Sequence, residues 1–261
     1  MRFEWLRELW SYRELLFFLV LRDLKIRYKQ TVLGIAWAVI QPLVATMIFF
    51  VVFGKLAGIP SDQLPYPVFA YSGLAVWTYF SGAVSYGSNS LVSNSGLLTK
   101  VYFPRLAIPA AAVMSGLLDF AIAALVLVAV MAYYGLTPSW LLLSWVLLAL
   151  PLVMLALGVS MLLSALNVRF RDVKYVVPFA LQIWLFVTPI IYPVSLVPER
   201  YRFLLALNPL TGYVETFRAL AIGGKPVDWA LLAISMAVTA VVFVVGLAYF
   251  QRAERSFADV I

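Results

Sequence analysis

The 261-residue sequence contains no cysteine and no histidine. Without thiols there are no disulfide bonds, and without thiols or imidazoles the chain lacks two common protein nucleophiles and the ordinary ligands of zinc and haem. We therefore expect no metal site and no thiol or imidazole chemistry in this chain.

Charged residues are also scarce. They make up 12% of the sequence, whereas soluble domains carry about 25%. Hydrophobic residues reach 64%, and the mean hydropathy is +0.97. This composition indicates an integral membrane protein. In so apolar a chain, the net charge of +7 is typical of basic residues at a cytoplasmic membrane face, so we expect membrane lipid and no nucleic acid as a partner.

Long uncharged segments are the main structural signal. A helix needs about 20 mostly apolar residues to cross roughly 30 Å of hydrocarbon. The six segments that meet this requirement are 32–53, 67–92, 106–134, 140–167, 176–197 and 229–250, and the third holds their one charged residue, Asp119. The sequence therefore predicts an all-α, polytopic membrane protein with six transmembrane helices, in a single membrane domain over residues 1–261.

The distribution of basic residues predicts the orientation. An even number of spans places both termini on one side of the membrane. Lys and Arg are concentrated on that side, in residues 2–29, 100–105, 169–174 and 252–255. The positive-inside rule therefore predicts cytoplasmic termini.

Residues 198–228 then lie on the outside, and their half-apolar segments FLLAL and YVETFRALAI are too short to cross a bilayer. Two short re-entrant periplasmic helices within 198–226, broken at Asn208 and Pro209, fit this pattern. Asn caps a helix start, and proline is tolerated in a first turn. An amphipathic loop on the outer leaflet is the alternative.

Two cytoplasmic segments show helical signals. Residues 1–31 carry apolar residues at helical spacing with Arg and Glu between them, which predicts an amphipathic helix in the membrane interface. After the second span, Asn94 and Ser95 can open a short helix that Pro104 ends. A short, stiff helix suits contact with another protein, and an ordinary capped turn bearing Lys100 and Arg105 is the alternative.

Sites for chemistry are few. Asp119 is the only acid inside a predicted span, where it costs ~3 kcal/mol unless it faces protein or water. It is either held by neighbours such as Ser115 or another helix, or it lines a polar path. A phosphate-binding loop needs GxxxxGK[ST], but Gly224-Lys225 is followed by Pro226 and lacks the earlier glycine. We therefore expect no nucleotide, no cofactor and no enzymatic activity in this chain.

Aromatic residues make up 15% of the sequence. Most such rings in membrane proteins face lipid or form interfacial belts. A subset facing a pore would offer flat surfaces with polar tips, suited to sliding contact with sugar rings. The candidates for lining a channel are Trp37, Gln41, Trp184, Phe186 and Tyr192.

Several stretches together resemble one family. They are RDLKIRYKQTVLGIAWAVIQPL (22–43), LLTKVYFPR (97–105), NVRFRDVKYVVPFALQIWLFVTPIIYP (167–193), LNPLTGYVETFR (207–218) and the tail FADVI. In combination they make the chain similar to the membrane subunits of ABC-2 type polysaccharide exporters, which include O-antigen and teichoic acid permeases. The resemblance covers nearly the whole chain.

This resemblance implies a homodimer in the bacterial inner membrane that binds two copies of a cytoplasmic ABC ATPase, where ATP and Mg would reside. It implies lipopolysaccharide biosynthesis and related glycan export as the setting. The substrate would be a long glycan on an undecaprenyl-type lipid carrier, threaded through a channel between the two copies of spans one and five.

The resemblance also implies roles for particular residues. Glu215 and Arg218 would pair with each other or across the dimer. The family's coupling element, which contacts the ATPase, corresponds to 94–105, with Asn94, Ser95, Leu97, Leu98, Thr99, Lys100, Phe103 and Arg105. Its periplasmic gate helices correspond to 198–220, with Asn208, Pro209, Tyr213, Glu215 and Arg218.

Three other functions compete with this interpretation. An ion-coupled secondary transporter would show paired repeats and several intramembrane ionisable groups, and one acid and no repeat are evident here. A membrane enzyme acting on lipid-linked sugars would need convergent carboxylates, whereas Asp172, Glu199 and Glu215 are scattered over both faces. An ABC-2 exporter of small lipids or drugs is the nearest rival.

Overall fold

The computed structural model describes residues 4–29, 34, 36–98, 103–222, 226–255 and 257. Every element that these residues form is a helix. In chain order the elements are α1 (Glu4–Ser11), α2 (Arg13–Tyr28), α3 (Ala36–Phe49), the π-helix η1 (Phe50–Leu56), α4 (Tyr66–Ser93), α5 (Ser95–Leu98), α6 (Ala107–Ser115), α7 (Leu117–Tyr133), the 3₁₀-helix η2 (Trp140–Ser144), α8 (Trp145–Arg169), α9 (Val173–Val187), the 3₁₀-helix η3 (Val194–Leu196), α10 (Glu199–Leu207), α11 (Pro209–Ile222) and α12 (Trp229–Glu254).

Within the described residues, four helical stretches are long and apolar enough to cross a membrane. They are Ala36–Leu56, Ala107–Tyr133, Trp140–Arg169 and Trp229–Glu254, and they correspond to the first, third, fourth and sixth predicted spans. The second predicted span forms α4, whose many hydroxyl-bearing residues lower its hydropathy.

The fifth predicted span, 176–197, has the wrong boundaries. Its helix, α9, begins at Val173 and ends at Val187. Thr188 has an extended backbone, with ψ of 136°, because it precedes Pro189 and a residue before proline is disfavoured in the α region. The ten residues that follow the helix run through a turn and η3 instead.

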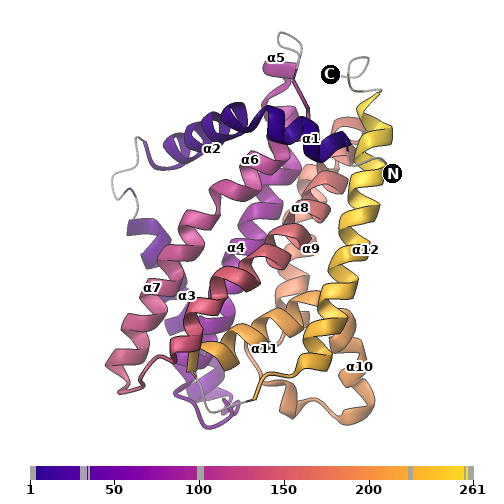
Figure 1. Cartoon of the computed structure of the whole chain (residues 1–261). Helices are drawn as coiled ribbons and strands as arrows, with labels where there is room; N and C mark the ends of the chain where they lie inside the picture. Colours follow the sequence, from indigo (N-terminus) through magenta and orange to yellow (C-terminus); the bar gives the residue numbers. More distant parts are fainter. Residues whose placement is uncertain are drawn as a thin grey trace.

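The helices are arranged so that the two ends of the chain lie together. Figure 1 shows α1, α2, α5 and both termini at one end of the molecule, and α10 and α11 at the opposite end. The long helices α4, α8 and α12 run between these two ends. The first helix, α1, the last helix, α12, and the link that contains α5 therefore meet at one end of the structure.

The predicted N-terminal helix forms two helices rather than one. Tyr12 interrupts it, with φ −102° and ψ 24°. Leu19 is buried, and Leu15 and Leu16 pack beside it against the α2-side core cluster, which contains Leu106 just before α6. Trp10 and Phe17, two of the apolar residues at helical spacing within 1–31, are exposed. An interfacial helix would present such aromatic side chains to a membrane.

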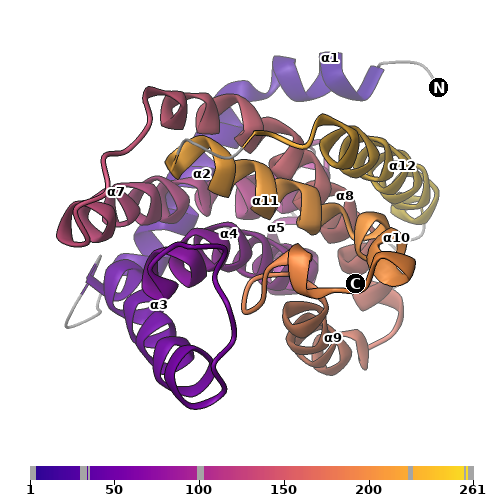
Figure 2. The ribbon, with the colours of Figure 1, turned by 90° about the horizontal axis from the view of Figure 1, so that it is seen from below.

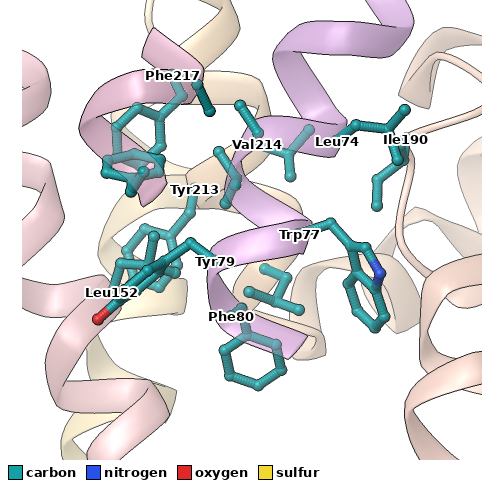
Figure 3. Close-up of a cluster of buried hydrophobic side chains, with 14 of the residues drawn as sticks. Leu74, Trp77, Tyr79, Phe80, Leu152, Ile190, Tyr213, Val214 and Phe217 are labelled. Carbon is teal, nitrogen blue, oxygen red and sulfur yellow. The ribbon is translucent and has the colours of Figure 1, made fainter. Parts of the chain in front are cut away.

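The core is built around α4, most of which is buried between α8, α6, α7 and α11. Figure 3 shows Leu74, Tyr79 and Phe80 of α4 beside Tyr213 and Phe217 of α11. α8 in turn packs on α12 at a close crossing. A Cβ atom on Gly246 would meet the carbonyl oxygen of Gly158, so glycine at both positions allows the two backbones to touch, as is common between membrane helices.

Candidate functional site

The predicted break in the NPLTGYVETFR segment is present. Asn208 separates α10 from α11, and its Oδ1 accepts hydrogen bonds from the backbone N–H of Leu210, at 3.2 Å, and from Trp184 Nε1, at 2.9 Å. Its Nδ2 donates to Thr188 Oγ1 at 3.0 Å. Asn208 therefore caps the start of α11, where Pro209 occupies the first helical position, and also ties it to the end of α9.

Arg218, near the end of α11, is buried in the protein with 2% of its surface exposed. Its Nη1 pairs with Glu215 Oε1 at 2.6 Å, which confirms that these two residues pair within one chain. Nε donates to Ser72 Oγ at 3.2 Å, and Nη2 donates to the carbonyl oxygens of Phe69, at 3.2 Å, and Pro189, at 3.4 Å. The guanidinium carbon also lies 3.7 Å from the Phe69 ring centre. Arg218 thus joins α11 to α4 and to the segment after α9.

The other side of α11 packs on α12. The hydroxyl groups of Tyr213 and Thr239 are 2.6 Å apart, and Tyr213 is completely buried. A Cβ atom on Gly212 would lie 2.8 Å from the carbonyl oxygen of Leu231, so only glycine permits this approach. Four of the five predicted gate residues are buried, and Glu215 is partly buried. The gate candidates are therefore held by contacts between α11, α4, α12 and the segment after α9.

A groove with a volume of about 490 Å³ opens between α3 and α9. Figure 2 shows these two helices on either side of α4. Residues of α4 form the floor of the groove, and residues of α7 and of the end of α2 close one side. Two predicted channel residues, Trp37 and Gln41 of α3, line this groove. The hydroxyl-bearing residues of its floor, Thr78, Ser81 and Ser85, were not predicted.

The remaining channel candidates lie elsewhere. Trp184 is partly buried, and its ring packs 5.0 Å from that of Phe80, centre to centre. Phe186 is exposed at the end of α9. Tyr192 donates a hydrogen bond to the carbonyl oxygen of Val187 at 3.2 Å. These three residues lie near or beyond the C-terminal end of α9 and do not line the groove.

Asp119 also lines the groove, and its carboxylate is held by another helix. It forms an ion pair with Arg27 and accepts a hydrogen bond from Tyr28, both at the end of α2. Arg27 donates to Ser115 Oγ at 3.2 Å and lies 4.5 Å from the centre of the Tyr86 ring. The first interpretation of Asp119 therefore describes its setting, since neighbouring side chains hold its carboxylate.

The link after α4 forms the predicted short helix in its first part. The carbonyl oxygen of Asn94 accepts from the N–H groups of Leu97, at 2.9 Å, and Leu98, at 3.3 Å. The Asn94 side chain turns back and donates to the carbonyl oxygen of Ser90 at 2.8 Å. Helix α5 therefore begins at Ser95, directly after the end of α4, and Asn94 links the two helices.

The predicted coupling residues have different environments. Leu97 is exposed, whereas Leu98 packs against the α2-side core cluster and Phe103 is buried within it. Arg105 donates a hydrogen bond to the carbonyl oxygen of Glu254 at the end of α12. Thr99 and Lys100 lie outside the described residues.

Comparison with known proteins identifies the family. Residues 14–222 match the ABC-2 type transporter family. The chain is 32% identical to an O-antigen export system permease protein RfbA of Klebsiella pneumoniae, over 95% of each chain. It is 30% identical to RfbA of Myxococcus xanthus, over 97% of each chain. It is 27% identical to the polysialic acid transport protein KpsM of Escherichia coli, over 91% of this chain and 93% of KpsM. The chain belongs to the ABC-2 type transporter family.

Proposed function

We propose that this chain is the membrane permease of an ATP-driven exporter that moves lipid-linked polysaccharide out across the bacterial inner membrane. The observation that carries the proposal is the likeness to O-antigen export permeases over 95% or more of the chain. An undecaprenyl-type carrier for the glycan is part of the proposal.

The groove between α3 and α9 supports this function. It combines an aromatic ring, Trp37, with an amide, Gln41, and with hydroxyl groups of α4. Flat rings and hydrogen-bonding side chains match the apolar faces and the hydroxyl groups of sugars. Two copies of the chain, joined so that their grooves face each other, would enclose a continuous channel, and we propose this homodimer as the working unit.

We further propose six spans in one membrane domain, with both termini cytoplasmic. The 28 residues of α4 extend about 42 Å at 1.5 Å per residue, which suffices to cross a bilayer. The 15 residues of α9 extend about 22 Å and are too short alone. Thr188, Pro189 and Ile190, which follow, are buried in protein, the condition under which irregular backbone is tolerated at membrane depth. α10 and α11 then form the re-entrant pair.

Energy would come from two copies of a separate ABC ATPase, which hold ATP and Mg. ATP binding would move α5, and because Asn94 fixes α5 to the end of α4, this displacement reaches the floor of the groove. Helix α11 would then move together with α4 and α12, since Arg218 joins it to α4 and Tyr213 joins it to α12. An ion-coupled transporter gains no support, because the carboxylate of Asp119 is already paired with Arg27.

The test is display of polysaccharide on cells that lack their own permease, supplied with this chain and the ATPase encoded beside it. Leu97→Ala removes an exposed side chain from α5 and should reduce display while the protein reaches the membrane at the normal level. Leu125→Ala, an equally conservative change at an exposed position of α7, serves as the control. Normal display with Leu97→Ala would show that this side chain of α5 does not take part in coupling to the ATPase. Absence of display with the unchanged chain would contradict the proposed function.

A further inference from the structure

The groove between α3 and α9 has almost no net charge. Arg27 and Asp119 are the two charged residues among those that line it, and they form an ion pair with each other. The helices that form its walls and floor continue this pattern. α3 and α4 contain no charged residue, and α9 contains one, Lys174, in its first turn.

The part of α4 that is not buried, which includes much of the floor of the groove, is polar although it is uncharged. Between Tyr71 and Leu91, the residues of α4 that are not buried fall on one face of the helix, at spacings of three and four. They are Thr78, Ser81, Gly82, Ser85, Tyr86 and Asn89. None of them is aliphatic, whereas a face turned to lipid would be. This face therefore suits an occupant that forms hydrogen bonds.

Several side chains of the groove have hydrogen-bonding capacity that the protein leaves unused. Within the described part of the chain, the Gln41 amide and the Ser85 hydroxyl make no hydrogen bond. Leaving an amide unpaired in hydrocarbon costs several kcal/mol. Both groups are accessible, so water or a hydroxyl-rich ligand can satisfy them and lipid chains cannot.

We propose that this groove binds an uncharged, hydroxyl-rich sugar chain and disfavours polyanionic polysaccharide. The inference rests on the proposed function and adds the charge class of its substrate. A polyanion in the membrane needs compensating cations, which anion pores supply as rings of Arg or Lys. Here the one cation of the described lining, Arg27, is neutralised by Asp119. Neutral sugars need only the hydroxyl, amide and ring groups that are present.

The absence of native cysteine allows a direct test by single substitutions. Ser85→Cys places a thiol in the groove, and Ser88→Cys, on the same helix at a position with 0% exposure, is the matched control. The chain, in lipid nanodiscs with its ATPase, is treated with a cationic and an anionic methanethiosulfonate reagent, and labelling is read as a mass shift. Ser81→Cys provides a second groove position if Ser85→Cys folds poorly.

The thiol of Ser85→Cys should react at least about tenfold faster than that of Ser88→Cys, because only a hydrated thiol forms the reactive thiolate. The ratio of its rates with the two reagents should lie within about twofold of the ratio for free cysteine, because an uncharged groove attracts neither ion. A neutral mannose oligomer should slow the labelling, and a sialic acid oligomer of the same length should not.

Contrary results would overturn the proposal in recognisable ways. Equal labelling of Ser85→Cys and Ser88→Cys would show that lipid or a second copy of the chain fills the groove. Equal or greater protection by the sialic acid oligomer would show that the groove accepts polyanions. Failure of the proposed function is distinguishable, since the unchanged chain would then display no polysaccharide on cells even though the labelling pattern held.

Discussion

Replacing Arg218 with methionine should destabilise the protein strongly. The change removes the cation that pairs with Glu215, whose side chain is only 11% exposed. Breaking a buried ion pair by deleting one partner costs about 3–5 kcal/mol, because the other charge stays buried. At about 2–4 °C per kcal/mol for a chain of this size, Tm should fall by about 6–20 °C.

The neighbouring helix provides a matched control. Arg202 of α10 also pairs with a glutamate three residues earlier, Glu199, but the two side chains are 43% and 90% exposed and the charged atoms are 3.8 Å apart. Exposed pairs contribute at most about 1 kcal/mol. Arg202→Met should therefore lower Tm by no more than about 4 °C. Thermal unfolding of the purified variants, followed in one detergent by intrinsic fluorescence, compares the two.

A double variant separates the charge from the packing. Glu215→Gln combined with Arg218→Met removes the buried charge that the single change leaves behind, so it should be more stable than Arg218→Met alone. Equal loss of stability in Arg218→Met and Arg202→Met would refute the reasoning. The reasoning would also be refuted if the double variant were no more stable than Arg218→Met.

Two further changes test contacts between helices. Gly246→Val would press its Cβ against the backbone carbonyl of Gly158, which cannot turn away, and should lower stability by about 1–3 kcal/mol or more; Leu125→Val, at an exposed position, should have little effect in the same thermal assay. Asp119→Asn leaves the partly buried guanidinium of Arg27 without its carboxylate partner. This should lower the stability of the protein by about 1–3 kcal/mol. Limited trypsin digestion should then cleave within α2 faster than in the unchanged chain, and identical digestion rates would show that the pair does not hold α2 in place.

Much of the helical framework could be predicted because long uncharged segments leave few alternatives. The spans at α3, α8 and α12 follow from length and apolarity, and the break at Asn208 follows from a capping residue next to a proline. The end of α9 was also visible in principle, since Thr188 precedes Pro189. A prediction from apolarity alone misses this helix end, because the residues beyond Pro189 remain hydrophobic.

The groove could not be predicted, because its residues are distinguished only by tertiary packing. Ser81 and Ser85 line it, while Ser72 and Ser88 of the same helix are buried, and nothing in their residue type separates the two pairs. The ion pair between Arg27 and Asp119 joins positions 92 residues apart, so no local sequence pattern predicts it. Which serine of α4 meets a substrate is decided by where α3 and α9 pack.

The central claim, that this chain is the permease of an ATP-driven polysaccharide exporter, is tested most directly by purification with the ATPase encoded beside it. A tagged form of the chain is isolated with that ATPase, and ATP hydrolysis is measured with and without lipid-linked polysaccharide. The account predicts a stable complex whose hydrolysis rate changes when the glycan is added. If no ATPase binds, or if the glycan leaves hydrolysis unchanged while the complex remains intact, the account is contradicted.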